Sequence, residues 1–305
     1  MSLVERAIKK MQAARETTPA GEPADAGHQQ GGAPVIGQLV HTGAIEVPAL
    51  RSGQPACRTD KVVRIDRQAL RIAGLLPPEN QEQVLANQYR QVKRPLIGAA
   101  LGRGTQKLDR GQLVMMASAM PGEGKTFTSI NLALSMALEK DLTVLLVDAD
   151  VAKPHISRIF GVEDEPGLLN VLRDEGTAPE AVILATDVPN LHIMPAGRRS
   201  ETATELLASQ RMEWLTGFLA SSDPRRVVLI DSPPLLPTTE ARALAHWVGQ
   251  VVMVVRSGFT PQQAVLDALE FLGTNKSVGL VLNQSITAPA GYYYGYGFAK
   301  GPANG

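Results

Sequence analysis

The chain has little of several features that define common protein classes. Its one cysteine, Cys57, cannot form an internal disulfide and fits a reducing compartment. Thirty basic and thirty acidic side chains balance, so the overall charge gives no reason to expect nucleic acid or a lipid surface as a ligand. No apolar run approaches the roughly eighteen residues of a membrane-spanning helix, and the N-terminus lacks the apolar core of a signal peptide. We therefore expect a cytoplasmic protein.

What the chain does have separates into four regions. Residues 1–14 predict a short amphipathic helix, which would either touch lipid or a partner or simply pack as a short helix. Residues 15–60 are rich in glycine, proline and small polar groups and predict a flexible, disordered linker. Residues 61–285 predict one folded domain, and residues 286–305 a mobile tail.

Apolar runs alternate with helix-like segments across residues 61–285. This alternation predicts an α/β fold, a mostly parallel sheet with helices on both faces. Such sheets place their ligands at the carboxyl ends of the strands, so the chemistry should follow directly after these runs. The expected strands are 112–117, 142–148, 190–195, 226–231, 250–255 and 278–282.

A glycine-rich loop joins the first of these strands to a helix-like segment at 126–139. Residues 118–126 read Ser-Ala-Met-Pro-Gly-Glu-Gly-Lys-Thr, which departs from the phosphate-binding loop pattern only at Ala119, where glycine is usual. Glycines let backbone N–H groups converge on phosphate oxygens, and the helix N-terminus adds a favourable dipole. Lys125 would reach the β- and γ-phosphates, and the Thr126 hydroxyl would hold Mg²⁺.

Carboxylates follow two other expected strands. Asp148 and Asp150 follow the run 142–148, and Asp231 ends the run 226–231 in a Walker B pattern. An aspartate at a strand end is often only a helix N-cap, but with Lys125 the set favours phosphate chemistry around Mg²⁺. Asn283 follows the last strand and is expected to contact the base; no guanine-reading motif follows it, so adenine is favoured.

The full set of residues expected to bind ATP can be named from this pattern. Thr126, Asp150 and Asp231 would hold the metal. The expected catalytic residues are Lys125, Asp148, Asp150 and Asp231. The expected ATP-binding residues are Pro121, Gly122, Glu123, Gly124, Lys125, Thr126, Phe127 and Asn283.

Aromatic residues are scarce, yet four of the five tyrosines lie in the last fourteen positions. Interspersed glycines keep that tail from forming a helix or a packed strand, so its tyrosines should be exposed. They would be either phosphate acceptors or contact groups in a sticky tail. These tyrosines are Tyr292, Tyr293, Tyr294 and Tyr296.

From about residue 61 to the end, the chain resembles the bacterial tyrosine kinases, P-loop autokinases of exopolysaccharide assembly. The resemblance rests on residues 120–126, 148–150, 231–234 and 279–283 and on the tyrosine-rich tail. Residues 1–8 and 65–70 look most like the exosortase-associated subgroup.

The resemblance implies a P-loop NTPase fold of the deviant Walker, MinD-like type and a kinase that phosphorylates its own tail tyrosines, usually between neighbouring subunits. It also implies a membrane polysaccharide co-polymerase as partner, which would hold the kinase at the inner membrane and control chain length. On this reading Asp148 accepts the proton of the incoming tyrosine.

Two departures from the family pattern bear on function. Ala152 stands where many members have an arginine after the paired aspartates, and Lys153 is adjacent. In the family's oligomerisation motif, Glu-x-x-Arg-x-x-Arg, this chain has Asn87 and Lys93 at the outer positions. Lysine lacks the bidentate fork of arginine, so a ring held by Glu–Arg pairs is in question.

Two other functions compete with the kinase. The first is a non-kinase ATPase of the MinD/ParA type, a dimerising switch that would share the fold. That group usually has a lysine early in the loop, where this chain has Met120, and this difference argues against the switch. A pseudo-enzyme scaffold would not need the intact Lys125, Thr126 and carboxylate set.

Overall fold

The computed structural model describes residues 58–103, 108–273 and 276–285. The predicted helix at 1–14, the linker up to residue 57 and the tail 286–305 with its four tyrosines lie outside these residues. Within them, no helix combines the length and apolarity needed to cross a bilayer.

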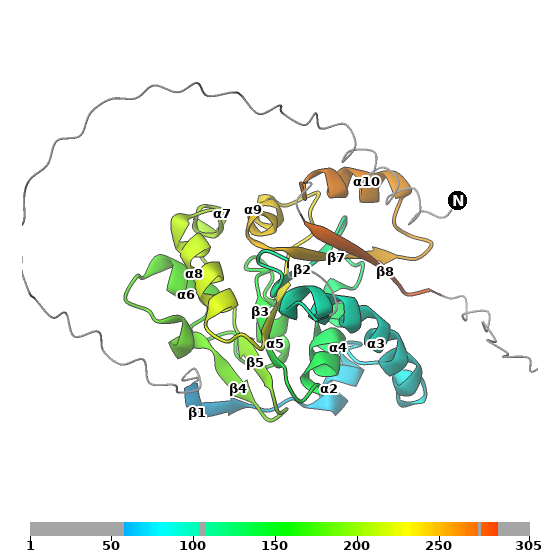
Figure 1. Cartoon of the computed structure of the whole chain (residues 1–305), viewed down its shortest axis with the longest axis horizontal. Coiled ribbons are helices and arrows are strands. Elements are labelled where there is room, and N and C mark those ends of the chain that lie inside the picture. Colours follow the sequence, from blue (N-terminus) through cyan, green and yellow to red (C-terminus); the bar gives the residue numbers. More distant parts are fainter. Residues whose placement is uncertain (1–57, 104–107, 274–275, 286–305) are drawn as a thin grey trace, which may run out of the picture. The chain divides into compact units, whose positions relative to one another are not determined.

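Eight described strands form one sheet in the order β1-β4-β5-β3-β6-β2-β7-β8 (Figure 1). All neighbouring pairs are parallel except β4 and β5. The strands are β1 (Arg58–Val63), β2 (Leu113–Ser118), β3 (Thr143–Asp148), β4 (Leu184–Thr186), β5 (Leu191–Met194), β6 (Arg226–Asp231), β7 (Gln250–Arg256) and β8 (Ser277–Asn283).

Helices flank this sheet, as the alternation of the sequence predicted (Figure 1). They are α2 (Arg67–Ile72), α3 (Glu79–Leu101), α4 (Lys125–Ala137), α5 (His155–Ile159), α6 (Leu168–Arg173), α7 (Ala203–Leu207), α8 (Gln210–Ser221), α9 (Thr239–Trp247) and α10 (Gln262–Glu270), with a 3₁₀ turn η1 (Pro179–Val182).

The central strands are buried on both faces, which explains their continuous apolar runs. Alternate residues of β2, β3 and β6 pack against α4 through Ile130, Ala133 and Met136. The intervening residues are also buried, and α8 and α9 contact β6 and β2. This two-sided burial fixes the register of the sheet and so brings the ends of β2, β3 and β6 to one edge.

The six predicted strands are all present, and two further strands were missed. β4 has three residues, too few to show a pattern, and it runs antiparallel to β5. β1 is an edge strand with three charged residues and begins at Arg58, so it includes the last three residues of the predicted linker. Edge strands tolerate such charge because only one side pairs.

α3 lies along α4, and its buried Lys93 joins the two helices. The Lys93 ammonium donates to the carbonyl of Ser135 at 2.6 Å and pairs with Glu139 at 2.7 Å. Asn87, the other altered position of the oligomerisation motif, accepts a hydrogen bond from Arg90 within α3. Lys93 is therefore committed to contacts within its own chain.

Candidate nucleotide site

The loop between β2 and α4 has the backbone that a phosphate cradle requires. Gly122 and Gly124 adopt left-handed conformations, with φ of 78° and 90°, which L side chains rarely adopt. α4 begins directly afterwards at Lys125, so its first N–H groups face the loop. Ala119, the departure from the glycine pattern, is buried and has no positive φ, so the site accepts its methyl group.

Lys125 lies folded against this loop. Its Nζ donates to Ser118 Oγ at 3.0 Å, and only 8% of the residue is exposed. Burial lowers the pKa of Lys125, while the carboxylates of Asp231, Asp150 and Glu123 act in the opposite direction. The lysine therefore sits at the base of the cradle as the cation expected to meet phosphate.

Asp231 is held by two hydroxyls of α4. Thr126 Oγ1 donates to Asp231 Oδ2 at 2.8 Å, and Ser129 Oγ donates to Oδ1 at 2.7 Å. Burial raises the pKa of Asp231, while these hydroxyls and Lys125 oppose the shift. Thr126 and Asp231, both expected to hold the metal, therefore lie within hydrogen-bonding distance of each other. Ser129 was missed, although it lies one turn after Thr126 on the same helix face.

Asp148 is fully buried and does not line the groove described below. Its Oδ2 accepts from both the backbone N–H and the hydroxyl of Ser157, each at 2.7 Å, while Oδ1 has no partner among the described residues. Burial raises the pKa of Asp148 to about 7. Ser157 lies in the first turn of α5, whose N-cap Pro154 supplies no side-chain bond. Asp148 thus caps α5, and the expected access of Asp148 to a tyrosine hydroxyl is not seen.

Asp150 is the half-buried carboxylate of the set, and it lines the groove. It accepts from the backbone N–H of Lys153 at 3.1 Å. Burial raises the pKa of Asp150, and Lys125 and Lys153 counteract this. Lys153, exposed beside Ala152 at the same groove, thus places a positive charge next to the position where arginine is absent.

A groove of about 2060 Å³ is lined by Lys125, Thr126 and Asp150, whereas Asp148 and Asp231 do not line it. It passes from α3 over the phosphate loop to Asp150 and to the end of β8. Of the predicted ATP-binding residues, all except Glu123 line it, namely Pro121, Gly122, Gly124, Lys125, Thr126, Phe127 and Asn283.

Glu123 and Asn283 are placed differently from expectation. The Glu123 carboxylate is fully buried and turned away from the groove. Asn283 Nδ2 donates to the Glu123 carbonyl at 3.0 Å and lies so close to Gly124 that a Cβ there would meet it at 2.0 Å. Asn283 therefore helps to hold the loop, and its contact with a base stays a prediction.

The arrangement fits a magnesium-bound phosphate ligand. Asp150 and Asp231, at or just beyond the ends of β3 and β6, interact electrostatically with Lys125, and burial raises the pKa of both and of Asp148 beside them. A divalent cation with oxygen preference would offset this excess negative charge. Thr126, Asp150 and Asp231 offer the oxygen ligands; when bound, the ion would neutralise charge on the phosphates.

Comparison with known proteins places the chain in a family. Residues 111–285 match the AAA domain family AAA_31. The tyrosine-protein kinase YwqD of Bacillus subtilis (strain 168) is 31% identical over 214 residues, which cover 70% of this chain and 86% of YwqD. The succinoglycan biosynthesis transport protein ExoP of Rhizobium meliloti (strain 1021) is 33% identical over 187 residues, 60% of this chain but 23% of ExoP.

Solved structures agree with this relationship. The kinase domain of VpsO superposes with a TM-score of 0.54 at 28% identity, covering 68% of this chain and 98% of that domain. The fold is therefore that of P-loop NTPases with a mostly parallel sheet, as the sequence predicted. With the AAA domain match and the likeness to YwqD, these findings show that the chain belongs to the bacterial tyrosine kinase family.

Proposed function

We propose that this protein is an ATP-dependent protein-tyrosine autokinase that phosphorylates Tyr292, Tyr293, Tyr294 and Tyr296 of its own C-terminal segment. One observation carries the proposal beyond the family. The last described residues, Asn283, Gln284 and Ser285, line the same groove as Lys125 and Asp150. The segment that contains the tyrosines is therefore tethered at the mouth of the nucleotide site.

Chain length is compatible with this assignment. Six residues separate Ser285 from Tyr292, and the seven steps between them cover at most about 3.6 Å each, or roughly 25 Å. Because Ser285 itself lines the groove, this reach is compatible with a tyrosine at the nucleotide site. The tether raises the local concentration of the acceptor at that site.

The described residues divide the work of phosphoryl transfer. Lys125 and the loop N–H groups would neutralise the β- and γ-phosphates, and Thr126 with Asp231 and Asp150 would position the magnesium ion of Mg-ATP. Asp150, which lines the groove, is the carboxylate placed to meet an incoming hydroxyl. Little covalent chemistry is asked of the protein, so positioning and charge supply most of the rate gain.

The biological setting belongs to the same proposal. Relatives include a succinoglycan biosynthesis transport protein, which supports a role in exopolysaccharide synthesis or export. We place the kinase in the cytoplasm, held at the inner membrane by a polysaccharide co-polymerase that it regulates and that sets chain length. Transfer of phosphate between copies requires self-association; Lys93, at an altered position of the oligomerisation motif, contacts Ser135 and Glu139 of its own chain.

The test is mass spectrometry of the tail after incubation with Mg-ATP. Phosphotyrosine should appear between Tyr292 and Tyr296, and changing all four tail tyrosines to phenylalanine should remove most of the label. Lys125→Met should abolish labelling while the circular dichroism spectrum stays unchanged. Unchanged labelling of the phenylalanine variant would place the acceptor elsewhere.

A mixing experiment separates transfer between copies from transfer within one copy. The Lys125→Met chain keeps its acceptors but lacks the phosphate-binding cation, and the tail-phenylalanine chain has the reverse. Label on the Lys125→Met chain only when both are present would show transfer between copies. ATP hydrolysis without phosphotyrosine in any mixture would favour a MinD/ParA-like switch instead.

A further inference from the structure

The phosphate loop contains a carboxylate that does not face its ligand. Glu123 is 0% exposed, and it does not line the groove, although its neighbours Gly122 and Gly124 do. Glu123 Oε2 accepts the backbone N–H of Met120 at 2.7 Å, and Oε1 accepts the hydroxyl of Thr260. Both oxygens are thus used inside the protein.

A buried negative charge in this position needs an explanation. It lies beside the place where a triphosphate would bind, and like charge there opposes binding. Desolvation adds a further cost, which the two donors offset. A charged acceptor makes stronger hydrogen bonds than a neutral one, so the carboxylate holds the loop more firmly than an amide or hydroxyl would.

Thr260 supplies the contact from a distant part of the chain. It lies in the loop between β7 and α10, 137 residues after Glu123. Its Oγ1 accepts the backbone N–H of Arg256 at 3.1 Å, and its own N–H donates to the Arg256 carbonyl at 3.1 Å. Because Oγ1 already accepts from Arg256, its single proton is directed to Glu123. The tight turn 256–260 therefore presents a fixed donor to the loop.

A second contact fixes the same residue from the other side. Asn283 holds the Glu123 carbonyl, and its amide lies against Gly124, as described above. The side chain of Glu123 is thereby tied to the turn after β7 and its main chain to the end of β8. These two contacts together hold the backbone of the phosphate loop, whose N–H groups are expected to point at phosphate oxygens.

We propose that Thr260 is a positioning residue for nucleotide binding, acting through the Glu123 carboxylate on the backbone of the phosphate loop. Thr260 does not line the groove and touches no group expected to contact ATP directly except through Glu123. Its loss should therefore weaken binding by loosening the loop. The inference rests on the proposed function only for the identity of the nucleotide.

The experiment compares Thr260→Val, which keeps the shape and removes the hydroxyl, with Thr260→Ser, which keeps the hydroxyl. The Kd for Mg-ATP, measured with a fluorescent ATP analogue, should rise about tenfold or more in Thr260→Val, because a bond to a charged group is lost. Thr260→Ser should stay within about threefold of the wild type. At saturating nucleotide the turnover of Thr260→Val should change less than about twofold, since Lys125 and the aspartates are untouched.

Thr216→Val is the matched control. Its hydroxyl is fully buried, whereas Thr260 is partly buried, and it donates to backbone carbonyls within α8, far along the chain from the loop. This variant should leave the Kd unchanged. Hydrogen exchange at residues 120–124 should quicken in Thr260→Val and not in the control, a change that a purely global loss of stability would not confine to the loop.

Several results would overturn the inference. One is a Kd for Mg-ATP in folded Thr260→Val that equals the wild-type value. Another is a Kd of Thr260→Ser as high as that of Thr260→Val, because the effect would then come from packing and not from the hydroxyl. Should Thr260→Val fail to fold, Glu123→Gln provides the same test, since it keeps the size of the side chain and removes its charge; unchanged affinity there would refute the proposal. A protein that binds Mg-ATP with these differences yet phosphorylates no tyrosine would contradict the proposed kinase function and leave this inference standing.

Discussion

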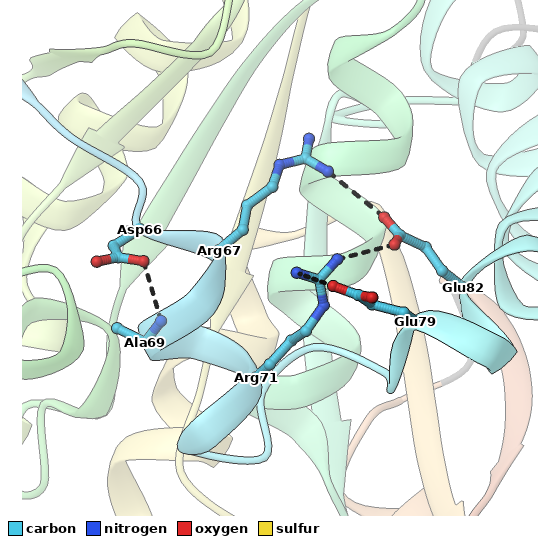
Figure 2. Close-up of polar contacts among 6 residues, drawn as sticks. All are labelled: Asp66, Arg67, Ala69, Arg71, Glu79 and Glu82. Carbon is cyan, nitrogen blue, oxygen red and sulfur yellow. Dashed lines mark hydrogen bonds and ion pairs between the residues drawn. The ribbon is translucent and has the colours of Figure 1, made fainter.

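At the ends of β3 and β6, Asp148 and Asp231 are almost fully buried, whereas the ion pairs that join α2 to α3 are partly exposed, from 22% of the Arg71 side chain to 79% of that of Glu79. Figure 2 shows the second region, where Arg67 and Arg71 reach Glu82 from one side. Both regions contain several charges of both signs within a few ångströms. The two regions contribute differently to the free energy of folding, because a buried charge lowers stability whereas an exposed ion pair changes it little.

The buried aspartates are kept at a cost to folding. Burial raises the pKa of each, which means that the folded protein disfavours their ionised forms. A side chain that lowers stability and is nevertheless surrounded by specific donors suggests selection for function. The exposed ion pairs show the opposite balance: little cost, and little gain.

The largest expected effect concerns Asp231. Asp231→Asn keeps the shape but removes the charge that faces Thr126 and Lys125. We expect tyrosine phosphorylation to fall by about a hundredfold or more, on the scale seen when one charge-stabilising group is removed from an active site. The thermal midpoint should stay equal or rise, because an unfavourable buried charge is gone.

Labelling assays and thermal melts of the same Asp231→Asn preparation check this pair of outcomes. The matched control is Asp223→Asn, a buried aspartate before β6 that lies away from the groove. Loss of stability together with loss of activity would mean that Asp231 is part of the structural core, and the contrast between the two regions would disappear.

A second prediction uses the dependence of stability on pH. The pKa of Asp148 is near 7 in the folded protein and near 3.8 as its reference value, so the unfolded chain releases this proton first. Between about pH 4 and 7 the folded state therefore holds more protons, and stability falls as pH rises. Asp148→Asn has no such proton, so the wild type should lose stability relative to this variant as pH rises from about 4 to about 7.

Urea unfolding at several pH values, in EDTA so that metal does not bind, measures this difference. Asp150 and Asp231 titrate in both proteins, so the difference reports Asp148 together with its repulsion by these two neighbours. A constant gap between the two proteins across this range would show that Asp148 is not buried in the way described.

Much of this fold followed from the sequence. The long strands are continuous apolar runs between turn signals, and their order along the chain was enough to predict a parallel sheet with a phosphate loop. β1 and β4 escaped detection because one is a charged edge strand and the other has three residues. The meeting of Lys125, Asp150 and Asp231 at one edge also followed, since parallel strands end together.

What did not follow was the direction in which polar side chains point. Glu123 turns away from the groove because Thr260, far along the chain, offers a donor there. Asp148 turns to Ser157 for the same kind of reason. Motif spacing contains no information about these distant partners, so it predicts which residues gather at a site but not which of them face the ligand.

The smallest expected effect lies in the α2–α3 cluster of Figure 2. Glu82→Gln removes the pairs to Arg71 at 2.9 Å and to Arg67 at 3.5 Å. Because about half of the Glu82 side chain is exposed, we expect a loss of less than about 1 kcal/mol in the free energy of unfolding. Urea titration checks this, and the difference should shrink further at high salt, where exposed charges are screened.

Glu79→Gln gives the matched comparison within the same cluster. Within the part of the chain that the structure describes, Glu79 pairs with Arg71 alone, at 3.5 Å, and its side chain is 79% exposed, so the change should be smaller still. An effect of Glu82→Gln well above 1 kcal/mol that also resists salt would show that these pairs support the fold as the buried contacts do. The contrast in folding energy between the buried aspartates and the α2–α3 ion pairs would then be wrong, and these ion pairs would have to be counted among the contacts that stabilise the fold beside the groove.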